Sequence, residues 1–221
     1  MPVNSTMPIN LLVALNSEAR PLIEHFDMKP DPLLSRLRVF TADNMRLVIS
    51  GIGQAAAATA VGYLSASDSV QNPVWVNIGV AGHPDAAIGV CFLVDKLIEE
   101  TTQRTHYPSV SFRSALPSAT LRTVVTPQTD YRHDALYDME GSSFFEAATK
   151  FTSIELVSLV KLVSDNRDHP LEKITKQFLY GLVKENIDAI AEVIGKISAL
   201  AAERDTIDDS FAQKWLYQRR A

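Results

Sequence analysis

Short apolar runs alternate with longer amphipathic segments along the chain, and this alternation predicts its secondary structure. Branched apolar residues cluster in four runs that are typical of buried strands, namely 9–15, 73–82, 89–100 and 120–126. Two further runs, 37–42 and 45–51, flank a polar turn at Asp43 and Asn44 and predict a β-hairpin. The polar stretch 101–118 contains two prolines and is expected to be a loop.

Helices are predicted between these strands. One follows the first strand, with Asn16 or Ser17 as its N-cap, and others are expected over 53–64, 140–151 and 185–203. The run 153–165 is compatible with a strand or a helix, and periodicity does not decide between them. Strands that alternate with helices predict one α/β domain with a mixed, mostly parallel central sheet flanked by helices. We expect this domain to span 1–203, followed by a C-terminal helical tail over 204–221.

Composition and charge narrow the class of protein. The chain has 221 residues, of which 46% are hydrophobic, and a formal net charge of -5, so nucleic acid is not an expected partner. Cys91 is the single cysteine, which excludes an internal disulfide and predicts a cytoplasmic protein. The N-terminal stretch has the pattern of neither a signal peptide nor a membrane span, so we expect no membrane association.

Two glycine turns follow predicted strands. The spacing Gly51-x-Gly53-x-x-Ala56 formally matches a dinucleotide fingerprint, but the next strand does not end in an acid, so close helix–sheet packing explains it better. A second turn over 77–83 also ends a strand. Ligands of open α/β sheets bind beyond the carboxyl ends of the strands, where backbone N–H groups can meet an anion or a sugar hydroxyl.

Three acidic residues occur at the ends of strand-like patterns, namely Glu18, Glu140 and Asp165. Each has an ordinary structural explanation when it is considered alone. Glu18 and Glu140 would favour the N-termini of helices through the helix dipole, and Asp165 would be a turn or cap residue.

Five segments considered together resemble the nucleoside phosphorylase superfamily. In chain order they read LLVALNSEA, SGIGQAAAA, VNIGVAG, DMEGSSFFEAA and LVSDNRD. The chain is most similar to the 5′-methylthioadenosine/S-adenosylhomocysteine nucleosidase branch, from about residue 9 to about residue 200. The most specific marks are DMEG before a small-residue helix and a strand that ends in SD. The resemblance implies a nucleoside phosphorylase-like fold and a nucleoside site at the first glycine turn.

The resemblance also implies roles for individual residues. Asp165 would protonate the leaving purine at N7, with Ser164 orienting it, and Glu18 would act on water. Met139 would lie against the ribose, and Glu140 would bind its 2′- and 3′-hydroxyls. The further residues expected to contact substrate are Gly53, Val80, Ala81, Gly82 and Tyr131.

Cleavage of an N-glycosidic bond requires acidic residues of the kind named above. Positive charge develops on the sugar, and a nearby carboxylate stabilises that charge. The purine leaves more easily once protonated, and a carboxylic acid supplies the proton near neutral pH only where burial or another negative charge raises its pKa. Water is the expected acceptor, because Val80 stands where phosphorylases have a hydroxyl, and Arg20 need not point at the site.

Some expectations stay open. Tyr131 would stack on the base or lie on the surface, because the segment 127–138 is short for base recognition. His106, His133 and His169 are expected to be exposed, and no metal or organic cofactor is implied. A nucleoside, with or without phosphate, is the expected small-molecule partner. A homo-oligomer is also expected, a dimer being favoured, in which Phe112 would reach the partner's site.

Three alternatives to a nucleosidase remain. The first is a phosphate-dependent phosphorylase, and the second is a nucleoside-binding protein of the same fold that has lost turnover. The third is a scaffold whose tail, with Phe211, Trp215 and Leu216 at helical spacing, is its working part.

Overall fold

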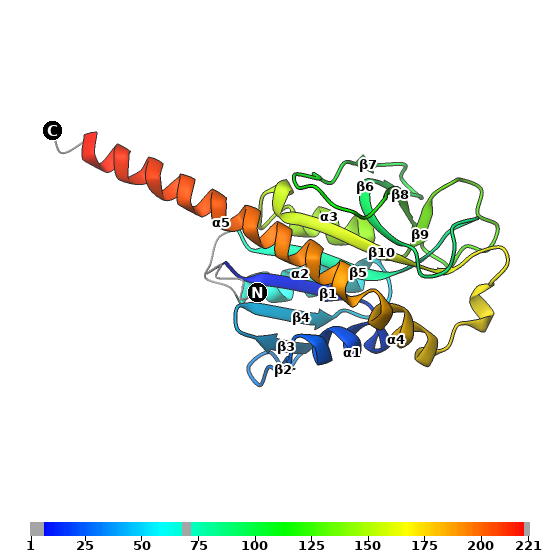
Figure 1. The fold of residues 1–221 in the computed structure, drawn as a ribbon. Coiled ribbons are helices and arrows are strands. Elements are labelled where there is room, and N and C mark those ends of the chain that lie inside the picture. The colour runs from blue at the N-terminus through cyan, green and yellow to red at the C-terminus, as the bar shows by residue number, and fades with distance from the viewer. Residues whose placement is uncertain (1–6, 68–71, 219–221) are drawn as a thin grey trace.

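The computed structural model describes residues 7–67 and 72–218, with side chains described as far as Arg204. It shows a single α/β domain with a ten-stranded mixed sheet (Figure 1). The strands are β1 (Ile9–Val13), β2 (Lys29–Pro30), β3 (Arg38–Ala42), β4 (Met45–Ile49), β5 (Val74–Gly82), β6 (Cys91–Glu99), β7 (Thr105–His106), β8 (Ser118–Thr123), β9 (Leu136–Asp138) and β10 (Val157–Asp165). The helices are α1 (Asn16–His25), α2 (Gln54–Ala66), α3 (Gly141–Ala148), α4 (Lys176–Glu185) and α5 (Ile187–Gln218), with 3₁₀ turns η1 (Ile154–Leu156) and η2 (Leu171–Lys173).

The sheet has a parallel centre and a closed end. Strands β4, β1, β5 and β10 lie side by side and parallel, so their carboxyl ends lie together at the same end of the sheet. Beyond β10 the order continues through β6, β8 and β9 and returns to β5, which closes a ring of five strands. The ring brings the end of β9 beside the ends of β5 and β10, which are far from it in sequence.

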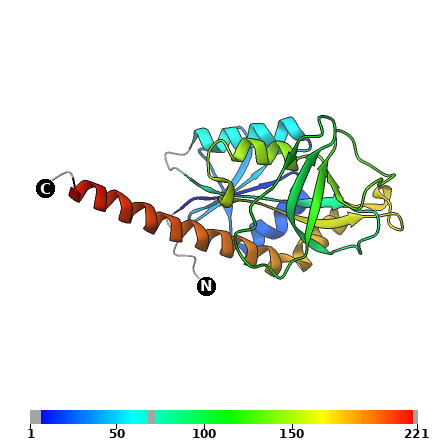
Figure 2. The same cartoon turned by 90° about the horizontal axis from the view of Figure 1, so that it is seen from above.

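Two helical layers cover the sheet (Figure 2). Helices α2 and α3 pack on one face, over a hydrophobic cluster that contains Leu12, Val48 and Phe144. Helices α1, α4 and α5 cover the other face, where Leu11 and Ile190 belong to a second cluster. Successive residues of β1 therefore enter opposite clusters, as expected for a strand buried on both faces.

The predicted α/β fold and the hairpin at Asp43 are confirmed. The open choice over 153–165 resolves as the 3₁₀ turn η1 followed by strand β10, which is buried along its whole length and pairs with β5 and β6. The loop expected over 101–118 contains the short strand β7. Strand β9 and helix α4 were not predicted.

The C-terminal part is one continuous helix. Helix α5 runs past residue 204 to Gln218, so the backbone crosses the predicted domain boundary without a break. Its last part extends beyond the sheet at the end opposite the carboxyl ends of the central strands (Figure 1). The division of the chain at 203 stays a prediction, and the side chains of Phe211, Trp215 and Leu216 lie outside the described residues. No helix in the described part of the chain is both long and apolar enough to span a membrane.

Candidate active site

A cavity of about 290 Å³ opens at the carboxyl ends of β1, β5 and β10. Its wall contains eight residues that the sequence predicts for the site: Glu18, Val80, Ala81, Gly82, Met139, Glu140, Ser164 and Asp165. The size is at the small end of the range for ligand pockets, and the position is the one expected for a ligand of a parallel α/β sheet. Strands distant in sequence thus bring the predicted acids together.

Glu18, in the first turn of α1, is held by two backbone amides, one from β5 and one from the residue before the helix. Its Oε1 accepts a hydrogen bond from the Val80 N–H at 3.0 Å, and its Oε2 accepts one from Leu15 N–H at 2.8 Å. The N-cap of α1 is therefore Leu15, not Asn16 or Ser17 as predicted, and Glu18 reaches back to it. Burial raises the pKa of Glu18, and the hydrogen bonds from Val80 and Leu15 partly offset this effect.

The first glycine turn binds a carboxylate of the protein itself. The Gly53 N–H donates to Glu140 Oε1 at 2.6 Å, and Gly51 and Gly53 have φ angles of 87° and 101°, which favour glycine. Glu140 is the N-cap residue of α3 but makes no side-chain capping bond there. Burial, and then the negative charge of Asp138, raise the pKa of Glu140 to about 7. The turn therefore fixes Glu140 in the site.

Asp165 ends β10 and is 4% exposed. Its Oδ1 accepts a hydrogen bond from the Ser164 hydroxyl at 2.6 Å, and its Oδ2 accepts one from the Tyr131 hydroxyl. These bonds hold the carboxyl group in place, so Asp165 is more than a turn residue. Ser164 has the orienting contact that the resemblance implies.

A buried ion pair, one member of which lines the cavity, was not anticipated from the sequence. Lys161 Nζ is 2.9 Å from Asp138 Oδ2, and the two side chains are 1% and 0% exposed. Asp138 also accepts hydrogen bonds from Thr123 Oγ1 and from the Gly141 N–H, both at 2.8 Å. The positive charge of Lys161 lowers the pKa of both Glu18 and Glu140, against the effect of burial. Lys161 is therefore part of the electrostatics of the site.

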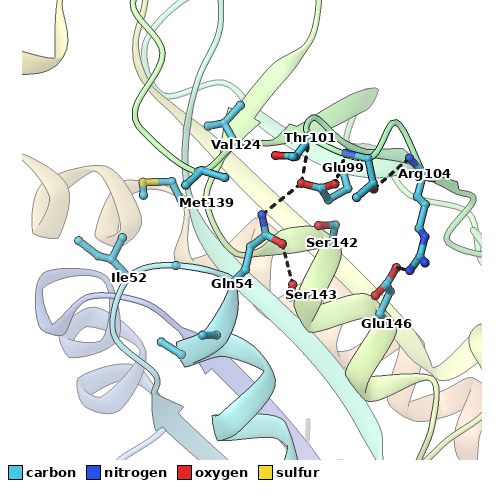
Figure 3. A pocket seen from close by; sticks show the side chains of 15 residues that line it. Ile52, Gln54, Glu99, Thr101, Arg104, Val124, Met139, Ser142, Ser143 and Glu146 are labelled. Carbon is cyan, nitrogen blue, oxygen red and sulfur yellow. Dashed lines mark hydrogen bonds and ion pairs between the residues drawn. The ribbon is translucent and has the colours of Figure 1, made fainter.

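A second, more open cavity of about 680 Å³ adjoins the first and shares Ile52, Val124 and Met139 with it (Figure 3). Gln54 bridges its two sides, donating to Glu99 Oε1 at 3.4 Å and accepting from Ser143 Oγ at 3.0 Å. Burial raises the pKa of Glu99, but hydrogen bonds from Thr102 and its neighbours outweigh this effect and lower the pKa to about 2. Glu99 thus stays ionised in this polar wall.

Two predicted site residues lie outside the wall of the smaller cavity. Gly53 lines the neighbouring cavity and reaches the site through Glu140. Tyr131 is 3% exposed, so the alternative of a surface aromatic is wrong. Its ring packs on Tyr137, with centroids 5.6 Å apart, and its hydroxyl reaches the site through Asp165.

The remaining expectations have mixed outcomes. His133 and His169 are exposed, but His106 is partly buried and lies 3.0 Å from Glu146 Oε1, so its predicted exposure is wrong. Arg20 is largely exposed and pairs with Glu24, away from the smaller cavity. Phe112 packs against the hydrophobic cluster of its own chain. The homo-oligomer stays a prediction.

Solved nucleosidase structures share this fold. The 5′-methylthioadenosine/S-adenosylhomocysteine nucleosidase of S. pneumoniae, solved with the transition-state inhibitor MT-ImmA, superposes with a TM-score of 0.68 at 18% identity, over 88% of this chain and 100% of that one. The Arabidopsis thaliana 5′-methylthioadenosine nucleosidase gives a TM-score of 0.70 at 18% identity, over 86% and 96% of the two chains. The Colwellia psychrerythraea nucleosidase, solved with adenine, gives 0.65 at 18% identity, over 88% and 95%.

These likenesses show that the chain has the nucleoside phosphorylase fold in the form found in 5′-methylthioadenosine/S-adenosylhomocysteine nucleosidases. No protein-family model matches the sequence, and no curated protein is detectably similar to it. The activity therefore has to be argued from the site itself.

Proposed function

We propose that the protein is a nucleosidase that hydrolyses the N-ribosidic bond of a purine nucleoside or of a thio-substituted relative. One observation carries the proposal: Glu18, Glu140 and Asp165, from three separate segments, converge on one small cavity at the carboxyl ends of the central strands. The shared fold with nucleosidases supports it. Protonation of the base, activation of water and binding of the ribose hydroxyls are three distinct roles, and each of the three residues can take one.

Asp165 is the proposed general acid. Its proton passes to N7 of the purine while the electron pair of the N-ribosidic bond moves onto the base, which leaves neutral. A ribosyl cation remains, and ionised carboxylates around the sugar stabilise it. Water then adds to C1′ and gives its proton to Glu18, whose two oxygens are already held by backbone amides.

Glu140 and Met139 are the proposed ribose contacts. An ionised Glu140 accepts hydrogen bonds from the 2′- and 3′-hydroxyls, and the Gly53 N–H on its Oε1 fixes its direction. Met139 lies in the wall between the two cavities and offers an apolar surface to the sugar ring. The second cavity leaves room beyond Met139 for a substituent on the ribose.

Water suits this cavity better than phosphate as the acceptor. Four carboxyl groups line the cavity, those of Glu18, Asp138, Glu140 and Asp165, and none of its lining residues has a cationic side chain. The Val80 N–H, in the glycine turn where an anion would be bound, already donates to Glu18. Asp138 is paired with Lys161 and Asp165 carries the proton to be donated, so the repulsion of a phosphate dianion would come from ionised Glu18 and Glu140, whereas water and a developing sugar cation would not be repelled.

The proposal is tested by release of base from a panel of purine nucleosides that includes methylthioadenosine and inosine. We expect Asp165→Asn to lower kcat/KM by about 10²- to 10⁴-fold, the range for loss of a general acid, and Glu140→Gln to lower it by weakening ribose binding. Asp168→Asn removes an exposed acid from the same loop and should have no effect. Equal activity of Asp165→Asn and wild type would contradict the assignment.

A further inference from the structure

The carboxyl group of Asp165 is held by hydroxyls on both of its oxygens. Ser164, its neighbour on β10, donates to Oδ1, and Tyr131 donates to Oδ2 from the segment between β8 and β9. Ser164 follows from the SD pair of the sequence, whereas Tyr131 lies 34 residues away and reaches Asp165 through the fold. Tyr131 thus makes a contact that no local pattern predicts.

The surroundings of Tyr131 fix its position. Its ring is buried in a small cluster with Val124, Ala135 and Tyr137. Its carbonyl oxygen accepts a hydrogen bond from Arg167 Nη2 at 3.2 Å, and Arg167 also pairs with Asp85. The φ angle of Tyr131 is 21°, an unusual value for an aromatic residue, and surrounding contacts have to maintain such a conformation. The hydroxyl is therefore held toward Asp165.

Gly82 leaves the space that this hydrogen bond needs. A Cβ atom at position 82 would lie 2.6 Å from Asp165 Oδ2 and 2.7 Å from the Tyr131 hydroxyl oxygen. Both distances are too short for real contacts, so a larger residue at the end of β5 would require the Asp165 carboxyl group, the Tyr131 hydroxyl or both to move. The glycine of the second turn thus serves the contact between Tyr131 and Asp165.

We propose that Tyr131 is a positioning residue for the general acid, acting with Ser164 to orient and stabilise the carboxylate that Asp165 becomes. This inference rests on the proposed nucleosidase function. When Asp165 gives its proton to the base, negative charge develops on its two oxygens, and the two hydroxyls donate to that charge. The contact lies on the buried side of Asp165, because Tyr131 is not part of the cavity wall.

Tyr131 can remain a donor over the whole working pH range. Burial and the neighbouring carboxylate of Asp165 both raise the pKa of the Tyr131 phenol, so its proton stays in place. A tyrosine in this state donates one hydrogen bond and does not itself exchange protons with substrate. Its contribution is expected in the chemical step and not in ribose binding.

The test compares Tyr131→Phe with Tyr63→Phe. Tyr63 is on α2, outside both cavities, and its hydroxyl accepts a hydrogen bond from the Arg36 N–H. Two substrates are used: the best purine nucleoside of the panel, and 7-methylguanosine, whose base leaves without protonation. For the purine nucleoside we expect Tyr131→Phe to lower kcat about 10- to 100-fold with KM nearly unchanged, which is the loss of a hydrogen bond to a charged group. For 7-methylguanosine we expect little change.

The comparison of the two substrates is a readout that a purely structural role would not change. A variant that had only lost stability or shape would lose activity equally on both substrates, whereas loss of a positioning contact to the general acid affects only the substrate whose base needs a proton. Equal losses on both substrates, or full activity of Tyr131→Phe on the purine nucleoside, would overturn the inference while leaving the nucleosidase proposal intact. A wild-type protein that releases no base would overturn the proposed function, and the inference with it.

Discussion

At the residue scale, three acids share one cavity but have different donors. Glu18 is held by two backbone amides, Glu140 by the amide of Gly53, and Asp165 by two hydroxyls. Burial raises the pKa of a carboxyl group, whereas hydrogen bonds to its charged form lower that pKa. Similar side chains can therefore take different roles because their donors and their burial differ.

The raised pKa of Glu140 gives a prediction for stability. The folded protein holds this proton more tightly than the unfolded chain, so the stabilisation is complete below about pH 4.5 and is lost as pH rises through about 7. From about pH 5 to about pH 8, the free energy of unfolding of wild type should therefore fall relative to Glu140→Gln, by on the order of 2 kcal/mol. Urea unfolding of both proteins across this range measures the difference, and parallel curves would contradict the assignment.

At the element scale, β10 carries both Asp165 and the positively charged Lys161. Lys161 is four residues before Asp165 on this strand and pairs with Asp138 at the end of β9. Because β9 has only three residues and pairs with β5 through a single position, this ion pair helps to fix it in the sheet. The ion pair thereby links β9, the strand that precedes Met139 and Glu140, to β10.

Replacement of Lys161 by methionine should destabilise the fold. It leaves Asp138 buried without its cation, and we expect a loss of about 3–5 kcal/mol in the free energy of unfolding. Lys29→Met is the matched control, because it breaks an exposed Lys–Asp pair that is worth at most about 1 kcal/mol. Denaturant unfolding compares the two variants, and similar small losses in both would show that the buried pair does not stabilise the sheet.

The elements that the sequence predicts well are long or strongly patterned. Strands β1, β5 and β6 and the hairpin at Asp43 follow from apolar runs and a polar turn. Strand β9 is too short to have a period, and only its pairing with β5 and β8 makes it a strand. Lys161 occurs inside an apolar run, and its partner is supplied by sheet order, which local sequence does not encode.

For the site too, local sequence predicts some residues but not the contacts that depend on the fold. The motif residues Glu18, Glu140 and Asp165 could be predicted because each stands at a strand end or in a local motif. The hydroxyl of Tyr131 on Asp165 could not, because it depends on the path of an irregular segment with a left-handed residue. Motifs thus point to the proposed reacting groups, and long-range contacts supply the groups that would orient them.

At the scale of the whole molecule, the site and the tail lie at opposite ends of the sheet. The cavity is at the carboxyl ends of the central strands, whereas the last part of α5 extends beyond the other end (Figure 1). The core residues of α5 range from Ile190 to Ala201, and Arg204 hydrogen bonds to Ser153 and Glu155. The described side chains of α5 therefore anchor this helix on the sheet as far as Arg204.

A chain shortened to end at Arg204 should fold and keep its activity, because it retains every residue of α5 that the structure places in the core within its described side chains. Thermal unfolding and the rate of base release, measured beside the full chain, check this expectation. A folded, shortened protein that has lost base release would instead favour the alternative in which the tail is the working part.

The most direct test of the nucleosidase proposal is the identity of the sugar product. The protein is incubated with its best purine nucleoside in phosphate buffer, and the base and sugar are separated and quantified. The cavity, with four acids and no cation in its wall, predicts equal amounts of free base and free ribose or thio-substituted ribose. A sugar 1-phosphate as the main product would contradict hydrolysis, and the absence of any released base would contradict catalysis.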